Sequence, residues 1–230
     1  MLNTALNIGI LIALAVVFVS FIAMIFRWKT DKRRVHVNHL LLATGAILCF
    51  GGIQQAVIRL VLAPAAHEQI AEMNAAREAE FAETSIVRVG DLFPDFSLRT
   101  VGGGDFSMLE AKGDVILINF FATWCGSCQN ELPHIDRIWA EHRGNANFRL
   151  IVIGRDESLE SVREYRDKNR FSFPIAADPD RKVYSLVADK LIPRTLLISR
   201  DGSVVYSKAG FCEDDLIQLK AVIEEQLAVL

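Results

Sequence analysis

Two cysteines lie three residues apart in the segment 124–128, which reads Trp-Cys-Gly-Ser-Cys. They follow a continuous apolar run, 115–121, of the kind that forms a strand buried on both faces of a sheet, and an amphipathic helix is predicted after them. The first turn of a helix stabilises a negative charge, so Cys125 is expected to be an exposed nucleophile that is partly thiolate near neutral pH. Cys125 would attack a disulfide, and the more buried Cys128 would resolve the mixed disulfide.

Three other uses of such a cysteine pair are less consistent with the sequence. A zinc site would need two more ligands, and neither a second Cys-x-x-Cys nor paired histidines follow. Covalent haem attachment requires histidine directly after the second cysteine, whereas Gln129 stands there. A purely structural disulfide at this spacing would close a loop too small to add much stability. The pair therefore predicts a redox centre that needs neither a metal nor a cofactor.

The composition supports chemistry at a membrane. The chain has 230 residues, 51% of them hydrophobic, and a formal net charge of −3. Its mean hydropathy of +0.26 is high for a soluble protein, and the excess lies before residue 64. The small negative charge gives no indication of a nucleic-acid partner. Four cysteines are too few for a disulfide-stapled scaffold, which again favours a catalytic pair.

Two apolar runs at the start of the chain predict two transmembrane helices. Residues 2–26 carry no charged side chain and exceed the ~20 residues that cross a hydrocarbon core. A cleaved signal peptide is disfavoured, because no basic residue precedes the run and no small-residue cleavage site ends it. The second run, 40–63, carries two glutamines and Arg59 in its second half, so a helix lying in the membrane interface is the alternative.

The basic loop 27–39 between the two runs sets the expected orientation. It holds five Lys and Arg residues within 27–34, and such loops remain in the cytoplasm. We therefore expect 1–63 to anchor the chain in the inner, or cytoplasmic, membrane, with the rest on the periplasmic or extracytoplasmic side. Residues 64–85 are rich in Ala and Glu and predict a mostly solvated helical stalk or, alternatively, a partner-binding helix.

Residues 86–230 alternate between strand and helix patterns and predict an α/β domain with helices on both faces of its sheet. After the cysteine pair, the patterns predict a buried strand at 148–154, an amphipathic helix at 158–168, a hairpin of 195–199 with 203–207 around the turn Arg200-Asp201-Gly202, and a final amphipathic helix through 216–227.

The segment 119–133, Asn-Phe-Phe-Ala-Thr-Trp-Cys-Gly-Ser-Cys-Gln-Asn-Glu-Leu-Pro, resembles the TlpA/ResA-like branch of the thioredoxin superfamily. The resemblance covers about 88–211 and includes 173–178, 192–195 and the lead-in 89–98, which is shared with peroxiredoxins of the AhpC/TSA type. It implies a thioredoxin-like central mixed sheet with helices on both faces, preceded here by the two predicted transmembrane helices. It also implies an exported, membrane-anchored enzyme that reduces protein disulfides, possible clients including those of cytochrome c maturation. A membrane thiol electron donor (CcdA/DsbD-like) would supply its electrons.

The resemblance also assigns roles to single residues. Pro193 matches the family's cis-proline, which packs beside the cysteines and leaves the Ile192 backbone free to pair with an extended substrate; an ordinary trans proline is the alternative. Glu131 matches a buried acid on the helical face of Cys128 that exchanges a proton during the reaction, and a solvated surface glutamate is the alternative. Trp124 matches an aromatic that shields the pair, although core packing would also explain it.

Several residues depart from the family pattern or remain ambiguous. Asn119 stands where classical thioredoxin carries a buried aspartate, which leaves Glu131 as the local carboxylate candidate. The dipeptide Gly-Ser at 126–127 replaces the commoner x-Pro, so the sequence does not determine whether the enzyme reduces or oxidises its clients. Cys212 is interpreted as a buried, inert cysteine rather than a third redox thiol, and His134 as a surface helix residue.

The sequence thus favours a protein-disulfide reductase over two alternatives. A thiol-dependent peroxidase would share the lead-in, but peroxiredoxins precede their nucleophile with Pro-x-x-x-Thr-x-x-Cys, and Ala122 occupies the threonine position. A non-enzymatic binding module or chaperone would use the same fold and the groove at Pro193 without turnover.

Overall fold

The computed structural model describes residues 44–45, 51–52, 55 and 63–228. The first predicted membrane helix and the basic loop lie outside the described residues, and the second predicted membrane helix is described only at scattered positions. Within the described part of the chain, no helix is both long enough and apolar enough to cross a membrane. The two membrane spans therefore stay predictions from the sequence.

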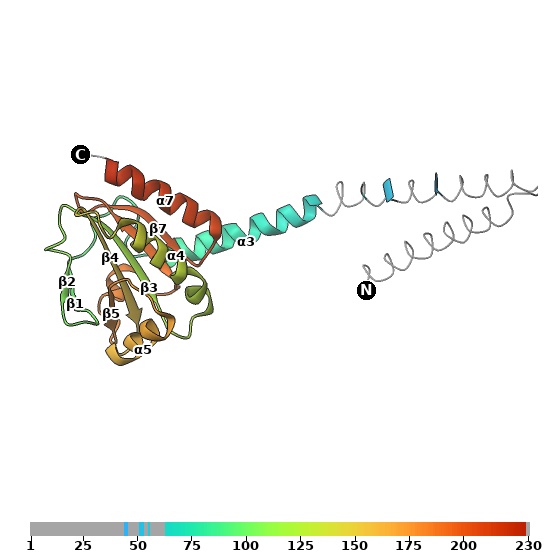
Figure 1. Ribbon diagram of the computed structural model, residues 1–230. Coiled ribbons are helices and arrows are strands. Elements are labelled where there is room, and N and C mark those ends of the chain that lie inside the picture. Colours follow the sequence, from blue (N-terminus) through green and yellow to red (C-terminus); the bar gives the residue numbers. More distant parts are fainter. Residues whose placement is uncertain (1–43, 46–50, 53–54, 56–62, 229–230) are drawn as a thin grey trace, which may run out of the picture. The chain divides into compact units, whose positions relative to one another are not determined.

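The chain divides into two compact units, Met1–Ala75 and Ala76–Leu230, so the second unit begins before the predicted domain boundary at 86. Helix α3 (Ala63–Thr84) crosses this division. Its side chains from 66 to 76 are exposed, as expected of a solvated helix. Its last turns belong to the second unit, which contains the cysteine pair (Figure 1).

The second unit is built on a five-stranded mixed sheet of order β5-β4-β3-β6-β7. The strands are β3 (Val115–Phe121), β4 (Phe148–Arg155), β5 (Ile175–Asp178), β6 (Arg194–Ile198) and β7 (Val204–Ala209). β3, β4 and β5 are mutually parallel, whereas β6 and β7 run antiparallel to their neighbours. β3 is central and buried at every residue, because an uninterrupted apolar strand is accommodated only with both faces covered.

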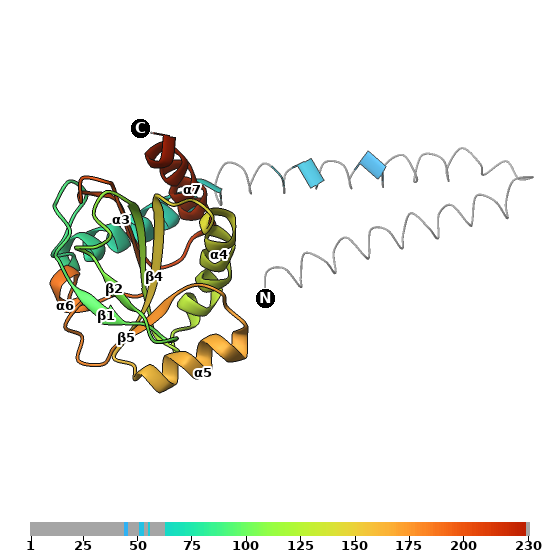
Figure 2. The same ribbon diagram turned by 60° about the vertical axis from the view of Figure 1, so that its left-hand side comes forward.

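One face of the sheet is covered by helices α4 (Gly126–His142), α5 (Leu159–Asn169) and α7 (Glu213–Ala228) (Figures 1 and 2). Each of these helices was predicted to be amphipathic, and each turns an apolar side to the core. The side chains that pack into it are Leu132, Ile135, Ile138, Val162, Leu216, Leu219 and Ile223, with Trp139, Leu159, Tyr165 and Leu227 half-buried at the margin.

The opposite face is covered mainly by irregular structure and by short elements that the sequence patterns did not predict. These are helix α6 (Tyr184–Val187) and a hairpin of β1 (Ser97–Arg99) with β2 (Asp105–Ser107). The hairpin lies against β5, where Thr100 bridges Ala176 (Figure 2). The thioredoxin-like α/β fold with a mixed sheet is thereby confirmed, and among the described residues this second face is covered by α6 and by the last turn of α3, which contacts Arg194.

Candidate active site

The cysteine pair lies where β3 ends and α4 begins, as predicted. Cys125 is the N-cap residue of α4, and a disulfide joins it to Cys128 across a Cα–Cα distance of 5.2 Å. Cys128 is fully buried and Cys125 is 6% exposed. Cys125 is therefore the more accessible of the two cysteines, but the prediction that it is exposed was wrong: it is buried, because the loop before Pro193 packs against it.

Two hydrogen-bond donors surround the sulfur of Cys125. The backbone N–H of Cys128 donates to Cys125 Sγ over 3.2 Å, and the Ser127 hydroxyl lies 3.4 Å from the same atom. Once the disulfide is reduced, both groups can stabilise a thiolate on Cys125, in addition to the dipole of α4. Ser127, which replaces the commoner proline between the cysteines, thus contributes a donor that proline lacks.

The peptide bond between Ile192 and Pro193 is cis, which confirms the predicted conformation of Pro193, while the role of these residues in substrate binding stays a prediction. Pro193 directly precedes β6, and its carbonyl accepts a hydrogen bond of 2.8 Å from the Gly210 N–H after β7. The carbonyl oxygen of Ile192 lies 3.8 Å from Cys125 Sγ. The loop that was predicted to pair with a substrate backbone therefore touches the predicted nucleophile.

Trp124 precedes the pair and is 67% exposed, which excludes core packing as the reason for an aromatic at this position. Its role in substrate binding stays a prediction. The adjoining Thr123 is held by Glu157, which precedes α5 and was not predicted as a site residue. The Glu157 carboxylate accepts hydrogen bonds from the Thr123 N–H (2.8 Å) and hydroxyl (2.6 Å), and this fixes the approach to Cys125.

Glu131 is 5% exposed, which excludes a solvated surface glutamate. Its carboxylate accepts one hydrogen bond from the Asn119 side-chain amide and one from the Thr195 hydroxyl, each 2.8 Å long. Burial raises the pKa of Glu131 from its ordinary value of 4.5 to about 7, while the two hydrogen bonds oppose the rise and the charge of Asp215 adds to it. A carboxyl with such a pKa can both accept and donate a proton near neutral pH.

Thr195 was missed as a site residue, although the sequence contained a usable signal. Thr195 follows the predicted cis-proline by two residues, and residues two apart in an extended segment share a face. In the structure Thr195 lies directly opposite Asn119 in the β3–β6 pair.

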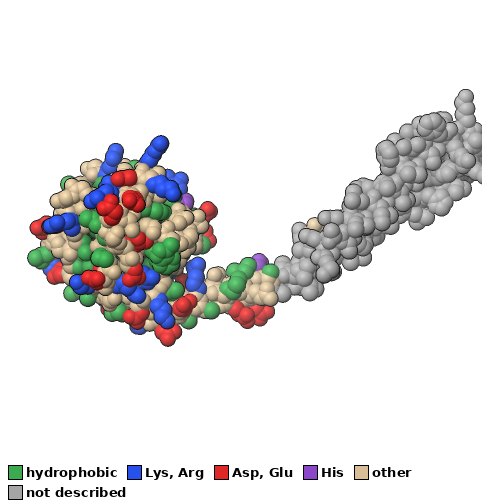
Figure 3. Space-filling model, turned by 90° about the horizontal axis from the view of Figure 1, so that it is seen from below, with side chains coloured by type: hydrophobic (Ala, Val, Ile, Leu, Met, Phe, Trp, Pro, Cys, Tyr) green, Lys and Arg blue, Asp and Glu red, His purple; other side chains and the backbone are tan. Residues whose placement is uncertain are grey.

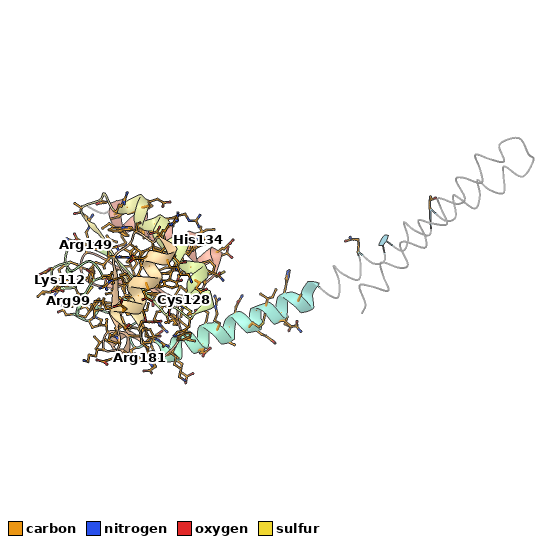
Figure 4. All side chains as sticks on the ribbon, turned by 60° about the horizontal axis from the view of Figure 1, so that its bottom comes forward. Arg99, Lys112, Cys128, His134, Arg149 and Arg181 are labelled. Atoms are coloured by element: carbon orange, nitrogen blue, oxygen red, sulfur yellow. A yellow bond between two sulfur atoms is a disulfide. The ribbon has the colours of Figure 1, made fainter. Side chains whose placement is uncertain are left out.

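Two further residues were considered in the sequence. Cys212 is free and partly exposed, so the interpretation of a buried cysteine was wrong; it lies in the short connection between β7 and α7. His134 lies along α4 beyond Cys128 (Figure 4) and packs at a tilt against Phe211, with ring centroids 5.4 Å apart. Desolvation and the nearby Arg137 lower the pKa of His134.

No cluster of three or more His, Cys, Asp or Glu side chains suited to a metal ion occurs among the residues that the structure describes. On the face of the second unit visible in Figure 3, basic and acidic side chains are intermixed, with apolar patches between them. The cysteine pair, the cis-proline loop and the buried carboxyl are thus the chemical groups that the fold brings together.

Similar sequences share this chemistry by name. The thiol-disulfide oxidoreductase ResA of Halalkalibacterium halodurans is 26% identical over 138 residues, which make up 60% of this chain and 78% of that protein. ResA of Bacillus subtilis is 27% identical over 139 residues, or 60% of this chain and 77% of that protein.

Two solved structures that resemble this chain are also named for thiol–disulfide chemistry. A candidate protein disulfide isomerase of Bacteroides thetaiotaomicron is 35% identical, with a TM-score of 0.61 over 63% of this chain and 92% of that chain. A candidate thiol:disulfide interchange protein DsbE of Chlorobium tepidum is 26% identical, with a TM-score of 0.55 over 62% of this chain and 99% of that chain. The sequence pattern of the Redoxin family matches residues 88–223, more than half of the chain. The chain therefore belongs to the Redoxin family and is a ResA/TlpA-like thiol–disulfide oxidoreductase.

Proposed function

We propose that this enzyme is anchored in the cytoplasmic membrane and reduces protein disulfides on the extracytoplasmic side. The observation that carries the catalytic part is the contact between Cys125 and the cis-proline loop, with the Ile192 carbonyl 3.8 Å from the sulfur. An extended client chain that pairs with the Ile192 backbone would bring its disulfide to this sulfur. The exposed Trp124 ring beside the pair offers an apolar surface to the same client.

The exchange proceeds in two substitutions. The Cys125 thiolate attacks one sulfur of the client disulfide, forms a mixed disulfide and expels the other client sulfur as a thiolate. Cys128, deprotonated by the Glu131 carboxylate, then attacks Cys125 and releases the remaining client thiolate. The enzyme dithiol is oxidised to the Cys125–Cys128 disulfide while the client disulfide gains two electrons.

The proton step is supported by the position of Glu131. It lies three residues after Cys128 on α4, hence on the same side of the helix, and both residues are buried. The proton that Cys128 loses passes to the carboxyl, which can return it when a donor reduces the disulfide again.

Clients and electron donor are proposed from the family. The curated relatives are named ResA, and one structural neighbour is named DsbE. We propose a membrane thiol electron donor (CcdA/DsbD-like) and clients that include disulfides of cytochrome c maturation. Anchoring is supported by the apolar runs 2–26 and 40–63 and by the five basic residues within 27–34.

Insulin reduction by the full chain tests the catalytic proposal. Wild-type protein supplied with dithiothreitol should precipitate the insulin B chain, and Cys125→Ser should reduce the rate to that of dithiothreitol alone. Cys128→Ser should instead accumulate a mixed disulfide on Cys125. A wild-type rate equal to the Cys125→Ser rate would favour a binding module without turnover, and rapid peroxide consumption would favour a peroxidase.

The direction of electron flow follows from a redox titration. A potential near the roughly −270 mV of thioredoxin supports a reductant, whereas one near −120 mV would make the enzyme an oxidant. Orientation is tested in intact cells with a membrane-impermeant maleimide. Cys212, partly exposed in the second unit, should react without permeabilisation, while a cysteine introduced by Asp31→Cys should not.

A further inference from the structure

Three polar side chains meet in the core beneath the cysteine pair. Asn119 on β3 is fully buried, Thr195 on β6 is 3% exposed and Glu131 on α4 is 5% exposed. Asn119 interrupts an otherwise apolar face of β3 that packs against α4. Three hydrogen bonds of 2.8 Å each connect the three side chains to one another. Burial of polar side chains lowers the stability of the fold unless they are hydrogen-bonded, so the presence of three of them in this part of the core requires an explanation.

The directions of these bonds fit an ionised carboxyl. The Asn119 amide nitrogen donates both to Glu131 Oε2 and to Thr195 Oγ1, and the Thr195 hydroxyl donates to Glu131 Oε1. Two of the three hydrogen bonds thus end on the carboxylate, one on each oxygen, and the third ties Asn119 to Thr195. The Asn119 carbonyl oxygen, in contrast, is buried and has no hydrogen-bond partner among the described residues.

That unpaired oxygen gives the cluster a second arrangement. Half a turn of the Asn119 amide exchanges its oxygen and nitrogen, which places the carbonyl oxygen toward Glu131 and Thr195. A Glu131 carboxyl protonated on Oε2 can then donate to the Asn119 carbonyl oxygen, while the Thr195 hydroxyl still donates to Glu131 Oε1. The hydrogen bond between Asn119 and Glu131 is thereby reversed, so the same side chains can bind the carboxyl in its protonated form.

We propose that Asn119 and Thr195 are positioning residues of the exchange reaction: they hold the Glu131 carboxyl in place and provide hydrogen-bond partners for both its ionised and its protonated form. This inference rests on the function proposed above, in which Glu131 takes the proton of Cys128. The ionised form precedes the attack of Cys128 on Cys125, and the protonated form follows it. Thr195 also adjoins the loop at Pro193, so the element that contacts the client helps to place the acid.

Other titratable groups also face Glu131. Asp215 on α7 raises its pKa, and Tyr206 on β7 lies close enough for the Glu131 charge to affect the Tyr206 pKa. Asp215 is itself paired with Lys208, at 3.8 Å. Among the influences on the Glu131 pKa, burial is the largest, and the hydrogen bonds from Thr195 and Asn119 are the two that lower it. Removing either donor should therefore raise the pKa further above 7.

The test compares Thr195→Val with Thr195→Ser in the full chain. Valine keeps the shape of threonine without the hydroxyl, whereas serine retains the donor. Thr100→Val is the matched control, because the Thr100 hydroxyl bonds to the Gly104 carbonyl outside this cluster. The ionisation midpoint of Glu131 is read from the infrared carboxyl band that Glu131→Gln abolishes, and insulin reduction is measured over the same pH range.

Thr195→Val should raise the midpoint by about one pH unit, equivalent to about 1.4 kcal/mol. The ionised fraction at pH 7 then falls from about half to about a tenth, so insulin reduction should slow roughly fivefold at pH 7 and recover at higher pH. Thr195→Ser and Thr100→Val should retain the wild-type midpoint. An unshifted midpoint in Thr195→Val, or a loss of rate that is equal at all pH values, overturns the inference. A wild-type protein that fails to reduce insulin refutes the proposed function instead, since the infrared midpoint needs no turnover.

Discussion

Replacing Glu131 with glutamine should make the protein more stable at alkaline pH. The carboxyl is 5% exposed, and its pKa rises from 4.5 to about 7 in the folded chain, mainly because burial penalises the charge. Below pH 4.5 the Glu131 carboxyl is neutral in both the folded and the unfolded chain, so its burial does not lower the free energy of unfolding. Between pH 4.5 and pH 7 the Glu131 carboxyl is ionised to a greater extent in the unfolded chain than in the folded chain, so the free energy of unfolding falls as the pH rises. At 1.36 kcal/mol per pKa unit the total loss is about 3 kcal/mol.

Glutamine has no charge to desolvate, and after a half turn of the Asn119 amide it can donate to the Asn119 carbonyl oxygen that is unpaired in the wild type. Equilibrium urea unfolding of the oxidised full chain, followed by tryptophan fluorescence from pH 4 to pH 8.5, measures the effect. The free-energy difference between Glu131→Gln and wild type should grow by about 3 kcal/mol over this range. With a urea slope of roughly 2 kcal/mol per molar, the midpoint difference should grow by ~1.5 M.

The matched control is Glu110→Gln, an exposed glutamate that should change this difference by less than ~0.5 kcal/mol. A difference between Glu131→Gln and wild type that stays constant from pH 4 to pH 8.5 would refute the reasoning. The Glu131 carboxyl would then titrate alike in the folded and unfolded chains, and its burial could not be what prepares it for proton transfer.

Two other predictions concern the exposed Trp124 beside the cysteine pair and the buried Arg194 directly after Pro193. Trp124→Ala should alter the free energy of unfolding by less than ~0.5 kcal/mol, because the ring is 67% exposed, yet raise the KM for insulin severalfold and leave the rate with a small aromatic disulfide unchanged. Equal effects on both substrates would contradict a client-binding role. Arg194→Lys should destabilise the domain by roughly 2 kcal/mol, because the fully buried guanidinium donates to Ser85 and Thr84 and lies 4.7 Å over the Phe81 ring. Amide hydrogen exchange in the last turn of α3 should accelerate as well, and unchanged exchange there would count against Arg194 as the contact that holds this turn.

Some elements followed directly from local sequence. The run 115–121 was predicted as a buried strand, and β3 has the same bounds, because seven consecutive apolar or amide side chains leave no face for solvent. The hairpin around Gly202 was also predicted, since glycine adopts the positive φ of 88° that the turn requires. These features depend on residues close together in the chain.

Other elements did not follow from local sequence. β1 and β2 are only three residues long, β5 is four, and α6 is a single turn. Segments this short carry no reliable periodicity. They exist because of partners distant in sequence, as when Thr100, directly after β1, bridges Ala176 within β5.

The features of the active site also fall into two groups, those predicted by local sequence and those decided by the tertiary structure. The spacing of Cys125 and Cys128 after a buried strand was enough to predict a redox pair at a helix N-terminus, because a strand, a helix start and a three-residue spacing are all local. The state of Glu131 was decided by the tertiary structure. Its pKa depends on burial under the sheet and on Asn119 and Thr195, which are 76 residues apart and become neighbours only when β3 pairs with β6. Local sequence specifies which groups can react, but desolvation and long-range hydrogen bonds determine the pH at which they do so.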